Sequence, residues 1–98
     1  MNILDLNENE LERISQIMKA VAHPTRMRIL CLLRDGAINV NDLGGLLGIK
    51  QALVSQQLRI LRLNGLVATE RRDGYVFYIL DPEKKKHIDR MIGCICNF

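Results

Sequence analysis

The residues that decide the fold are 47–57, which read LGIKQALVSQQ. An apolar run precedes them, Gly48 supplies a turn, and Lys50 begins a second helical segment whose first side chains are polar. A short helix, a turn containing glycine and a second helix with a polar start are typical of the helix-turn-helix, whose second helix lies in the major groove of DNA. Residues 41–63 are therefore predicted to be a DNA-reading unit.

The second helix of this unit, over residues 50–63, has an apolar face and a polar face. The apolar side chains expected to point into the core are Leu53, Val54, Leu58 and Leu61. The side chains expected to read base edges are Gln51, Ala52, Ser55 and Gln56, because glutamine pairs with adenine and alanine contacts the thymine methyl group. Lys50 and Arg59 are expected to bind phosphates, which sets the register without reading sequence.

Two extended runs follow this helix. Residues 66–72 and 75–80 are rich in β-branched and aromatic side chains, and Asp73-Gly74 between them is a strong signal for a two-residue hairpin turn. The hairpin would form the wing of a winged helix-turn-helix. Its tip carries Arg71 and Arg72, followed by Tyr75, and is expected to reach the minor groove or the phosphate backbone.

Capping signals place the helices that precede the reading unit. Asn7 is expected to cap a first helix, with Glu10 three residues later. Pro24 ends that helix and fits the first turn of a second helix over residues 24–34. Residues 37–40 form an extended connector, and Asn39 or Asn41 caps a short third helix that ends at Gly48.

A last helix is expected after the hairpin, with residues 81–83 as its cap and first turn. The chain is thus predicted to be mainly α-helical: four helices, a β-hairpin wing and a fifth helix. With 98 residues it has room for one domain, over residues 1–98, and its core is marginal alone.

The first and last helices are each expected to carry an apolar stripe. The first stripe consists of Leu11, Ile14, Ile17, Met18 and Val21. The second consists of Ile88, Met91, Ile92 and Ile95. A core this small is marginal alone, and a partner subunit would help to complete it.

Composition and charge narrow the function classes. The net charge is +3, with acidic residues in excess over residues 1–22 and basic residues in excess over residues 48–78, which suggests a basic working face. No apolar run approaches the roughly 18 residues needed to cross a bilayer, so no membrane association is expected. The first residues lack the features of a signal peptide, which favours a cytoplasmic protein.

An enzyme is not expected. The sequence has no glycine loop that would cradle phosphates, and Cys31 lies between Leu30 and Leu32 rather than beside a cation that would lower its pKa. A module that only binds other proteins would explain the helices but not the polar reading helix together with the basic wing. Binding to double-stranded DNA explains both.

Five segments of the chain resemble the ArsR/SmtB family of bacterial repressors. They are His23–Leu30, Val40–Leu43, Val54–Leu61, Gly65–Val67 and Tyr75–Tyr78. The resemblance implies a winged helix-turn-helix homodimer, joined through its first and last helices, that sits on an inverted-repeat operator and releases it when an inducer acts. It also implies base contacts from the four reading side chains named above, and wing contacts from Arg72 and Tyr75.

The metal sites best known in the family are not matched here. Val40–Leu43 stands where arsenic sensors have Cys-Val-Cys, and the last helix offers only His87 and Asp89 toward a zinc site. The expected DNA-binding protein therefore needs no cofactor and no metal.

The cysteines resemble those of the dithiol branch of the family, the BigR and SqrR type, which responds to oxidants or reactive sulfur. That resemblance implies a bond between Cys31 and a cysteine near the end of the last helix. Cys96, four residues after Ile92, is the expected partner, and Cys94 is the alternative.

Two other readings of the cysteines stay open at this point. If the last turn frays after Gly93, Cys31, Cys94 and Cys96 could together bind arsenite or a soft metal ion. Alternatively Cys31 is only a small core side chain.

Overall fold

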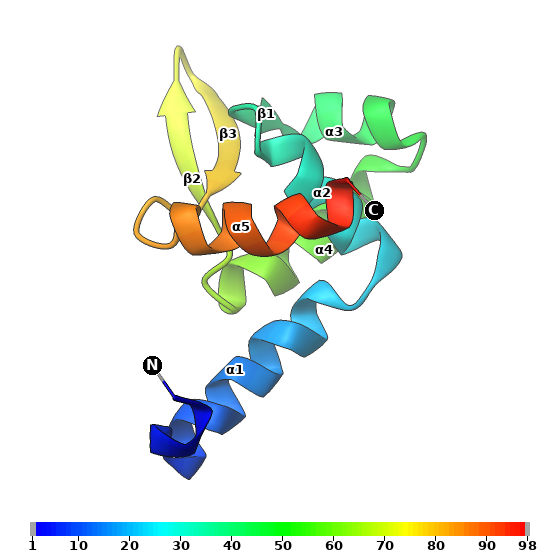
Figure 1. The fold of residues 1–98 in the computed structure, drawn as a ribbon. Coiled ribbons are helices and arrows are strands. Elements are labelled where there is room, and N and C mark those ends of the chain that lie inside the picture. Colours follow the sequence, from blue (N-terminus) through cyan, green and yellow to red (C-terminus); the bar gives the residue numbers. More distant parts are fainter. Residues whose placement is uncertain (1, 98) are drawn as a thin grey trace.

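The computed structural model describes residues 2–97, and within them the chain forms five α-helices and a three-stranded sheet (Figure 1). The helices are α1 Glu8–Val21, α2 Pro24–Leu33, α3 Val40–Leu47, α4 Gln51–Leu63 and α5 Lys85–Cys96. The strands are β1 Ile38–Asn39, β2 Val67–Arg72 and β3 Tyr75–Leu80, and a 3-10 turn, Ile3–Asp5, precedes α1. The predicted order of four helices, a hairpin and a fifth helix is confirmed.

The predicted capping signals act where the sequence puts them. The Asn7 side chain accepts a hydrogen bond from the Glu10 backbone N–H (2.8 Å) and donates one to its carboxylate. His23 caps α2 by accepting from the Thr25 N–H at 3.2 Å, and Asn39 rather than Asn41 caps α3. Local chemistry therefore fixes where these three helices begin.

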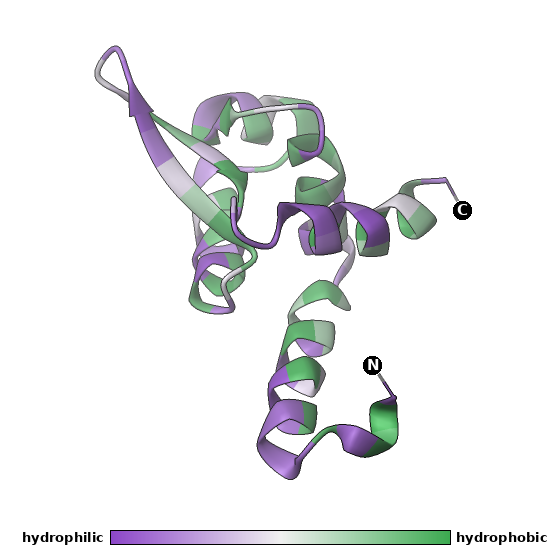
Figure 2. Ribbon diagram, turned by 60° about the vertical axis from the view of Figure 1, so that its left-hand side comes forward, coloured by the Kyte–Doolittle hydropathy of each residue, from purple (hydrophilic) through white to green (hydrophobic). Residues whose placement is uncertain are grey.

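The wing is the hairpin of β2 and β3. Strand pairing runs from Val67 with Leu80 to Arg72 with Tyr75. The turn residues Asp73 and Gly74 both have positive φ (49° and 83°), which a tight hairpin turn requires. β1 pairs with the opposite edge of β3, a strand that the sequence indicated only as an extended connector. Figure 2 shows the far end of the wing coloured hydrophilic, away from the body of the molecule.

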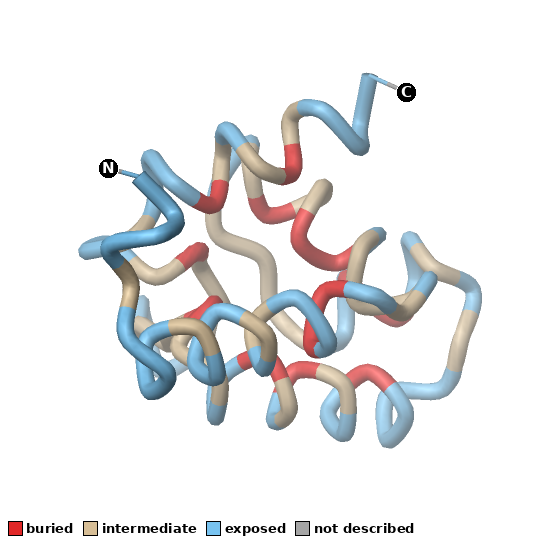
Figure 3. Tube along the Cα trace, turned by 60° about the horizontal axis from the view of Figure 1, so that its bottom comes forward, coloured by how far each residue is buried: buried red, intermediate tan, exposed pale blue. Residues whose placement is uncertain are grey.

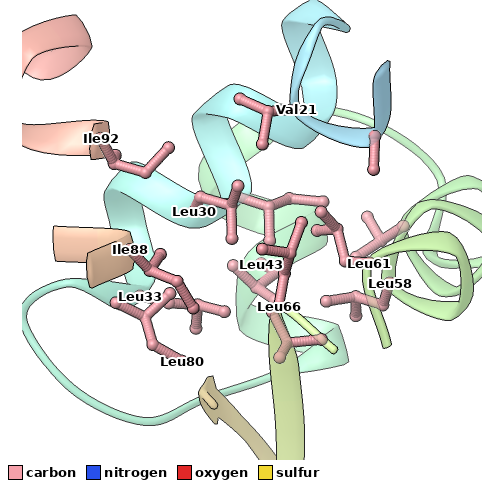
Figure 4. Packing of buried hydrophobic residues seen from close by; sticks show 14 residues of the cluster. Val21, Leu30, Leu33, Leu43, Leu58, Leu61, Leu66, Leu80, Ile88 and Ile92 are labelled. Carbon is pink, nitrogen blue, oxygen red and sulfur yellow. The ribbon is translucent and has the colours of Figure 1, made fainter. Parts of the chain in front are cut away.

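The hydrophobic core lies between α2, α4, α5 and the base of the sheet (Figure 4). Its fully buried side chains include Leu30, Leu58, Leu61, Leu66 and Ile92. By contrast, α1 projects away from the packed helices and sheet, and most of its residues are coloured exposed or intermediate in Figure 3. The radius of gyration, 14.1 Å, exceeds the roughly 13 Å expected for a compact domain of this length because α1 projects.

Two expectations about helices are wrong. Leu53 does not point into the core, because Val54, Leu58 and Leu61 form the inward row and Leu53 lies one position off it, 47% exposed. The last helix does not begin at residues 81–83. The Asp81 side chain accepts from the Glu83 N–H and stabilises a separate turn, so α5 begins at Lys85.

None of the helices within residues 2–97 combines the length and the apolar character needed to span a membrane.

Candidate DNA interface and cysteine pair

The outer face of α4 is polar and open to solvent. All the side chains of this face that are expected to contact DNA are exposed. They are Lys50, Gln51, Ala52, Ser55, Gln56 and Arg59. Lys50 is the cap residue of α4 and its side chain makes no capping hydrogen bond. Backbone N–H groups in the first helical turn have no partner within the helix, and such groups bind phosphates. The start of α4 is therefore suited to the DNA backbone.

Two glycines let α3 and α4 approach each other. Gly48 ends α3 in the left-handed conformation (φ 67°), which few other residues adopt without strain. At Gly44, a Cβ atom would lie 3.2 Å from the Ile49 carbonyl oxygen and 3.8 Å from a Val54 methyl group. The close approach of α3 to the turn and to α4 thus depends on the absence of a side chain at Gly44.

Arg26 connects three helices and was not identified from the sequence. Its Nε donates to the Ala20 carbonyl oxygen near the end of α1 (2.5 Å), and its Nη1 donates to Oε1 of Gln57 on α4 (2.8 Å). Both contacts are partly buried. Arg26 therefore fixes α4 relative to the junction of α1 and α2.

The two arginines of the wing differ in their surroundings. Arg72 forms an ion pair with Glu70 on the same strand, and its guanidinium lies 5.7 Å from the centre of the Phe77 ring. Arg71 and Tyr75 are exposed. Among residues 2–97 no ion pair or side-chain hydrogen bond involves Arg71. Arg71 is thus the wing cation that no internal contact holds.

Cys31 and Cys96 form a disulfide that joins α2 to α5, with their Cα atoms 6.2 Å apart. The two helices run antiparallel here, because Arg34, one turn after Cys31, forms an ion pair with Asp89, two turns before Cys96 (2.8 Å). Gly93 lies where the Arg34 guanidinium crosses α5, so a Cβ there would be 3.3 Å from it. The ion pair and the glycine together set the register that brings the two sulfurs into contact.

The choice of Cys96 over Cys94 follows from helical spacing. Ile88 and Ile92 are buried against α2, and Cys96 continues that row at the same interval of four residues. Cys94 is a free, exposed thiol on another face. The expected pairing with Cys96 is confirmed.

The three-thiolate alternative lacks the frayed turn that it requires. α5 continues as a helix through Cys96, so Cys94 points away from Cys31. Within residues 2–97 no three histidine, cysteine or acidic side chains are grouped so that they could bind a metal ion. His23, His87 and Asp89 do not form a site in this part of the chain.

The face of α1 that was expected to meet a partner subunit is largely uncovered. The expectation for α5 is wrong in part, because Ile88 and Ile92 are buried in the chain's own core and only Met91 and Ile95 of that stripe are accessible to a partner. Ile14 and Met18 of α1 are 43% and 57% exposed. They border a hollow of about 370 Å³ between α1 and α5, which Met91 also lines. The chain thus has an exposed apolar surface on α1 as well as the exposed polar face of α4.

Comparison with known proteins places the chain among bacterial regulators. Residues 23–69 match the family described as "Bacterial regulatory protein, arsR family". The chain is 35% identical over 77 residues to the "Biofilm growth-associated repressor" of Xylella fastidiosa, which covers 79% of this chain and 68% of that protein. It is also 35% identical over 86 residues to the "Transcriptional activator HlyU" of Vibrio cholerae, covering 88% and 79%.

A solved structure agrees with these matches. The transcriptional repressor BigR from Xylella fastidiosa superimposes with a TM-score of 0.81 at 31% identity, over 92% of this chain and 90% of that one. The winged helix-turn-helix expected from the sequence is thereby confirmed.

Proposed function

The chain belongs to the ArsR family of bacterial regulatory proteins, and from this premise we propose that it is a homodimeric repressor that releases its operator when Cys31 and Cys96 become linked. The family consists of DNA-binding transcriptional regulators, so the expectation that the chain is not an enzyme is confirmed. The proposal adds the direction of regulation, the dimer and the role of the cysteines.

The observation that carries the proposal is the bond between α2 and α5. α5 belongs to the surface proposed to meet the partner subunit. α2 belongs to the reading half, because its Arg26 holds Gln57 of α4. A bond that forms or breaks between α2 and α5 therefore acts on the connection between the dimer contact and the reading helix. Cytosolic disulfides are typically transient bonds of this sensing kind.

The DNA contacts follow from two-fold symmetry. In a homodimer the two α4 helices enter successive major grooves, about 34 Å apart, and read an inverted repeat. Base edges are contacted by Gln51, Ala52, Ser55 and Gln56. Phosphates and the minor groove are contacted by Lys50, Arg59, Arg71, Arg72 and Tyr75. A change in dimer geometry alters this spacing, so both half-sites no longer fit at once.

Repression is the direction favoured by the relative from Xylella fastidiosa, whose name describes a repressor. The relative from Vibrio cholerae is named as an activator. A reporter gene under the chain's own promoter region separates the two. We expect expression to fall when the chain is produced and to recover on treatment with an oxidant. Expression that instead rises with the chain would contradict repression.

The test of DNA recognition is a salt titration with the reduced protein. Affinity for the promoter region and for an unrelated duplex is measured from low to physiological salt. Each phosphate contact contributes a slope of about −0.9 in the double-logarithmic plot, so a dimer with several contacts gives a steep line. We expect the promoter duplex to bind more tightly at every salt concentration. Equal affinity for both duplexes would contradict an operator-binding function.

A further inference from the structure

A groove lies beside the disulfide, and the proposed DNA contacts do not use it. It has a volume of about 530 Å³ and lies between α2, the end of α3 and the end of α5. Its apolar lining consists of Met27, Cys31, Leu32, Leu46, Leu47 and Ile95. Leu46 on the wall of the groove is 63% exposed. An aliphatic ligand in the groove would cover it.

The groove is also the surface at which Cys31 is reached. Cys31 is half-buried, and it forms part of the groove wall. A reagent that reacts with the Cys31 sulfur from this side has to rest against leucine, isoleucine and methionine side chains. An apolar wall of this kind favours reagents with an aliphatic portion, since each methylene removed from water contributes to binding.

One cation marks the rim. Arg28 is exposed and lines the groove one helical turn before Cys31, and no acidic side chain among residues 2–97 lines the groove. Its guanidinium is therefore the charged group that a ligand meets there. A guanidinium pairs well with a carboxylate. The ligand that fits an apolar wall, a cation at the rim and a sulfur that is oxidised under the proposed function is an amphiphilic, negatively charged oxidant.

We propose that the groove binds aliphatic hydroperoxides that bear a carboxylate, such as fatty-acid hydroperoxides, and delivers them to Cys31. This inference rests on the proposed thiol-based release of DNA and names the class of inducer. The aliphatic chain lies along Leu46, Leu47 and Ile95, and the carboxylate binds Arg28.

The reaction consumes one hydroperoxide for each disulfide. The Cys31 thiolate attacks the terminal oxygen, the O–O bond breaks, and the leaving alkoxide takes up a proton to become an alcohol. Cys31 is then a sulfenic acid. The Cys96 thiolate attacks its sulfur, the S–S bond forms, and hydroxide leaves and takes up a proton to become water. Two thiols and one hydroperoxide thus give a disulfide, an alcohol and a water molecule.

The groove also connects this chemistry to the reading unit. Leu46 and Leu47 belong to α3, the helix that packs against α4, while Ile95 lies next to Cys96 on α5. The bound oxidant therefore contacts the reading half and the dimer half of the chain at the point where the disulfide forms.

The test measures the rate of Cys31–Cys96 disulfide formation in the fully reduced chain, by alkylation of remaining thiols and intact mass spectrometry. Four oxidants are compared: a medium-chain hydroperoxy acid below its micelle concentration, its methyl ester, tert-butyl hydroperoxide and hydrogen peroxide. We expect the hydroperoxy acid to react about tenfold or more faster than tert-butyl hydroperoxide, because its chain is buried along the groove. The acid should exceed the ester by a factor of about three, the range of an exposed ion pair.

Two variants separate the contribution of the Arg28 charge to the reaction rate from that of the apolar wall. Arg28→Gln should bring the rates for acid and ester together and leave the rate for hydrogen peroxide unchanged. Leu46→Ser should lower the rate of disulfide formation only for the two long-chain oxidants. The fold should tolerate this change because the Leu46 side chain is largely exposed. Arg90→Gln, an exposed arginine on α5 away from the groove, is the matched control and should change no rate.

The outcomes distinguish this inference from the proposed function. A disulfide that forms equally fast with all four oxidants, or an acid-to-ester ratio unaffected by Arg28→Gln, overturns the groove as a hydroperoxide site but leaves dithiol sensing intact. If inorganic polysulfide forms the disulfide and none of the hydroperoxides does, the groove as a hydroperoxide site is likewise overturned and dithiol sensing is left intact. If no oxidant joins Cys31 to Cys96, or if the joined form binds the promoter duplex as tightly as the reduced form, the proposed function itself fails.

Discussion

The helices α4 and α1 each leave one face uncovered by the rest of the chain, and the two faces differ in chemistry. The uncovered face of α4 carries Gln51, Ser55, Gln56 and Arg59, which are stable in water and are also suited to a DNA groove. The uncovered face of α1 carries Ile14 and Met18, whose exposure to water is energetically unfavourable. Under the proposed function, one chain therefore holds a complete reading surface but only half of an assembly surface.

The largest effect is expected from a change on the assembly surface. In the double variant Ile14→Glu with Met18→Glu, a charge would have to be buried in the dimer contact, so the chain should become monomeric. Loss of the second reading helix should lower operator affinity about 100-fold or more, because two linked contacts become one. Sedimentation and a binding titration measure the two effects.

Gln16→Glu is the matched control for this variant. Gln16 is an exposed α1 residue between the two apolar positions, and its change adds a charge on a different face. We expect it to remain dimeric. A double variant that stays dimeric, or that becomes monomeric without losing operator affinity, would contradict the division into two surfaces.

The next effect concerns the reading surface itself. Ser55→Ala and Gln56→Ala should each weaken operator binding by about 1–3 kcal/mol, as expected for the loss of a base contact, and should leave binding to an unrelated duplex nearly unchanged. Anisotropy titrations on both duplexes provide the comparison. Equal losses on both duplexes would show that these side chains do not read bases.

A smaller effect is expected where the two regions connect. Arg26→Gln removes the bonds to Ala20 and Gln57, and we expect operator affinity to fall about tenfold. Arg28→Gln, an exposed change of the same kind two residues along α2, should not alter it. Combining Arg26→Gln with Gln57→Ala tests the contact directly. If the effects of the two changes simply add, the two side chains are not coupled.

The smallest effect is expected at the wing. Arg71→Gln should reduce the salt dependence of binding by about one phosphate contact on any duplex. Arg72→Gln should reduce it less, since Arg72 is already held by Glu70 and Phe77. The reverse order would mean that the ion pair opens on DNA.

The sequence predicted those features that depend on neighbouring residues. Asn7 with Glu10, Gly48 and Asp73-Gly74 act through contacts within a few positions, and each lies where it was expected. The sequence also predicted that the polar side chains proposed to contact DNA are exposed on α4, because the helical period assigns them to the outer face once the core row is known.

The sequence did not predict features that depend on how distant elements pack. Arg26 and Gln57 are 31 positions apart and meet only because α2 and α4 cross at that point. Leu53 was placed inside because its apolar character outweighed its position one residue off the buried row. The start of α5 was placed too early because Asp81 stabilises a turn in the same way that it would cap a helix. The groove beside Cys31 is built from three helices, so no single segment indicates it.

Whether the Cys31–Cys96 bond releases DNA is decided by operator affinity in the two redox states of the same protein. The chain is prepared with Cys31 and Cys96 reduced and with the two joined, and each form is titrated onto the promoter duplex. Cys31→Ser and Cys94→Ser serve as variants treated in parallel. We expect the reduced form to bind the promoter duplex at least about tenfold more tightly. We also expect Cys31→Ser to keep its operator affinity under oxidant and Cys94→Ser to behave like the parent chain. Equal affinity in the two redox states, or normal release by Cys31→Ser, would contradict release by this bond.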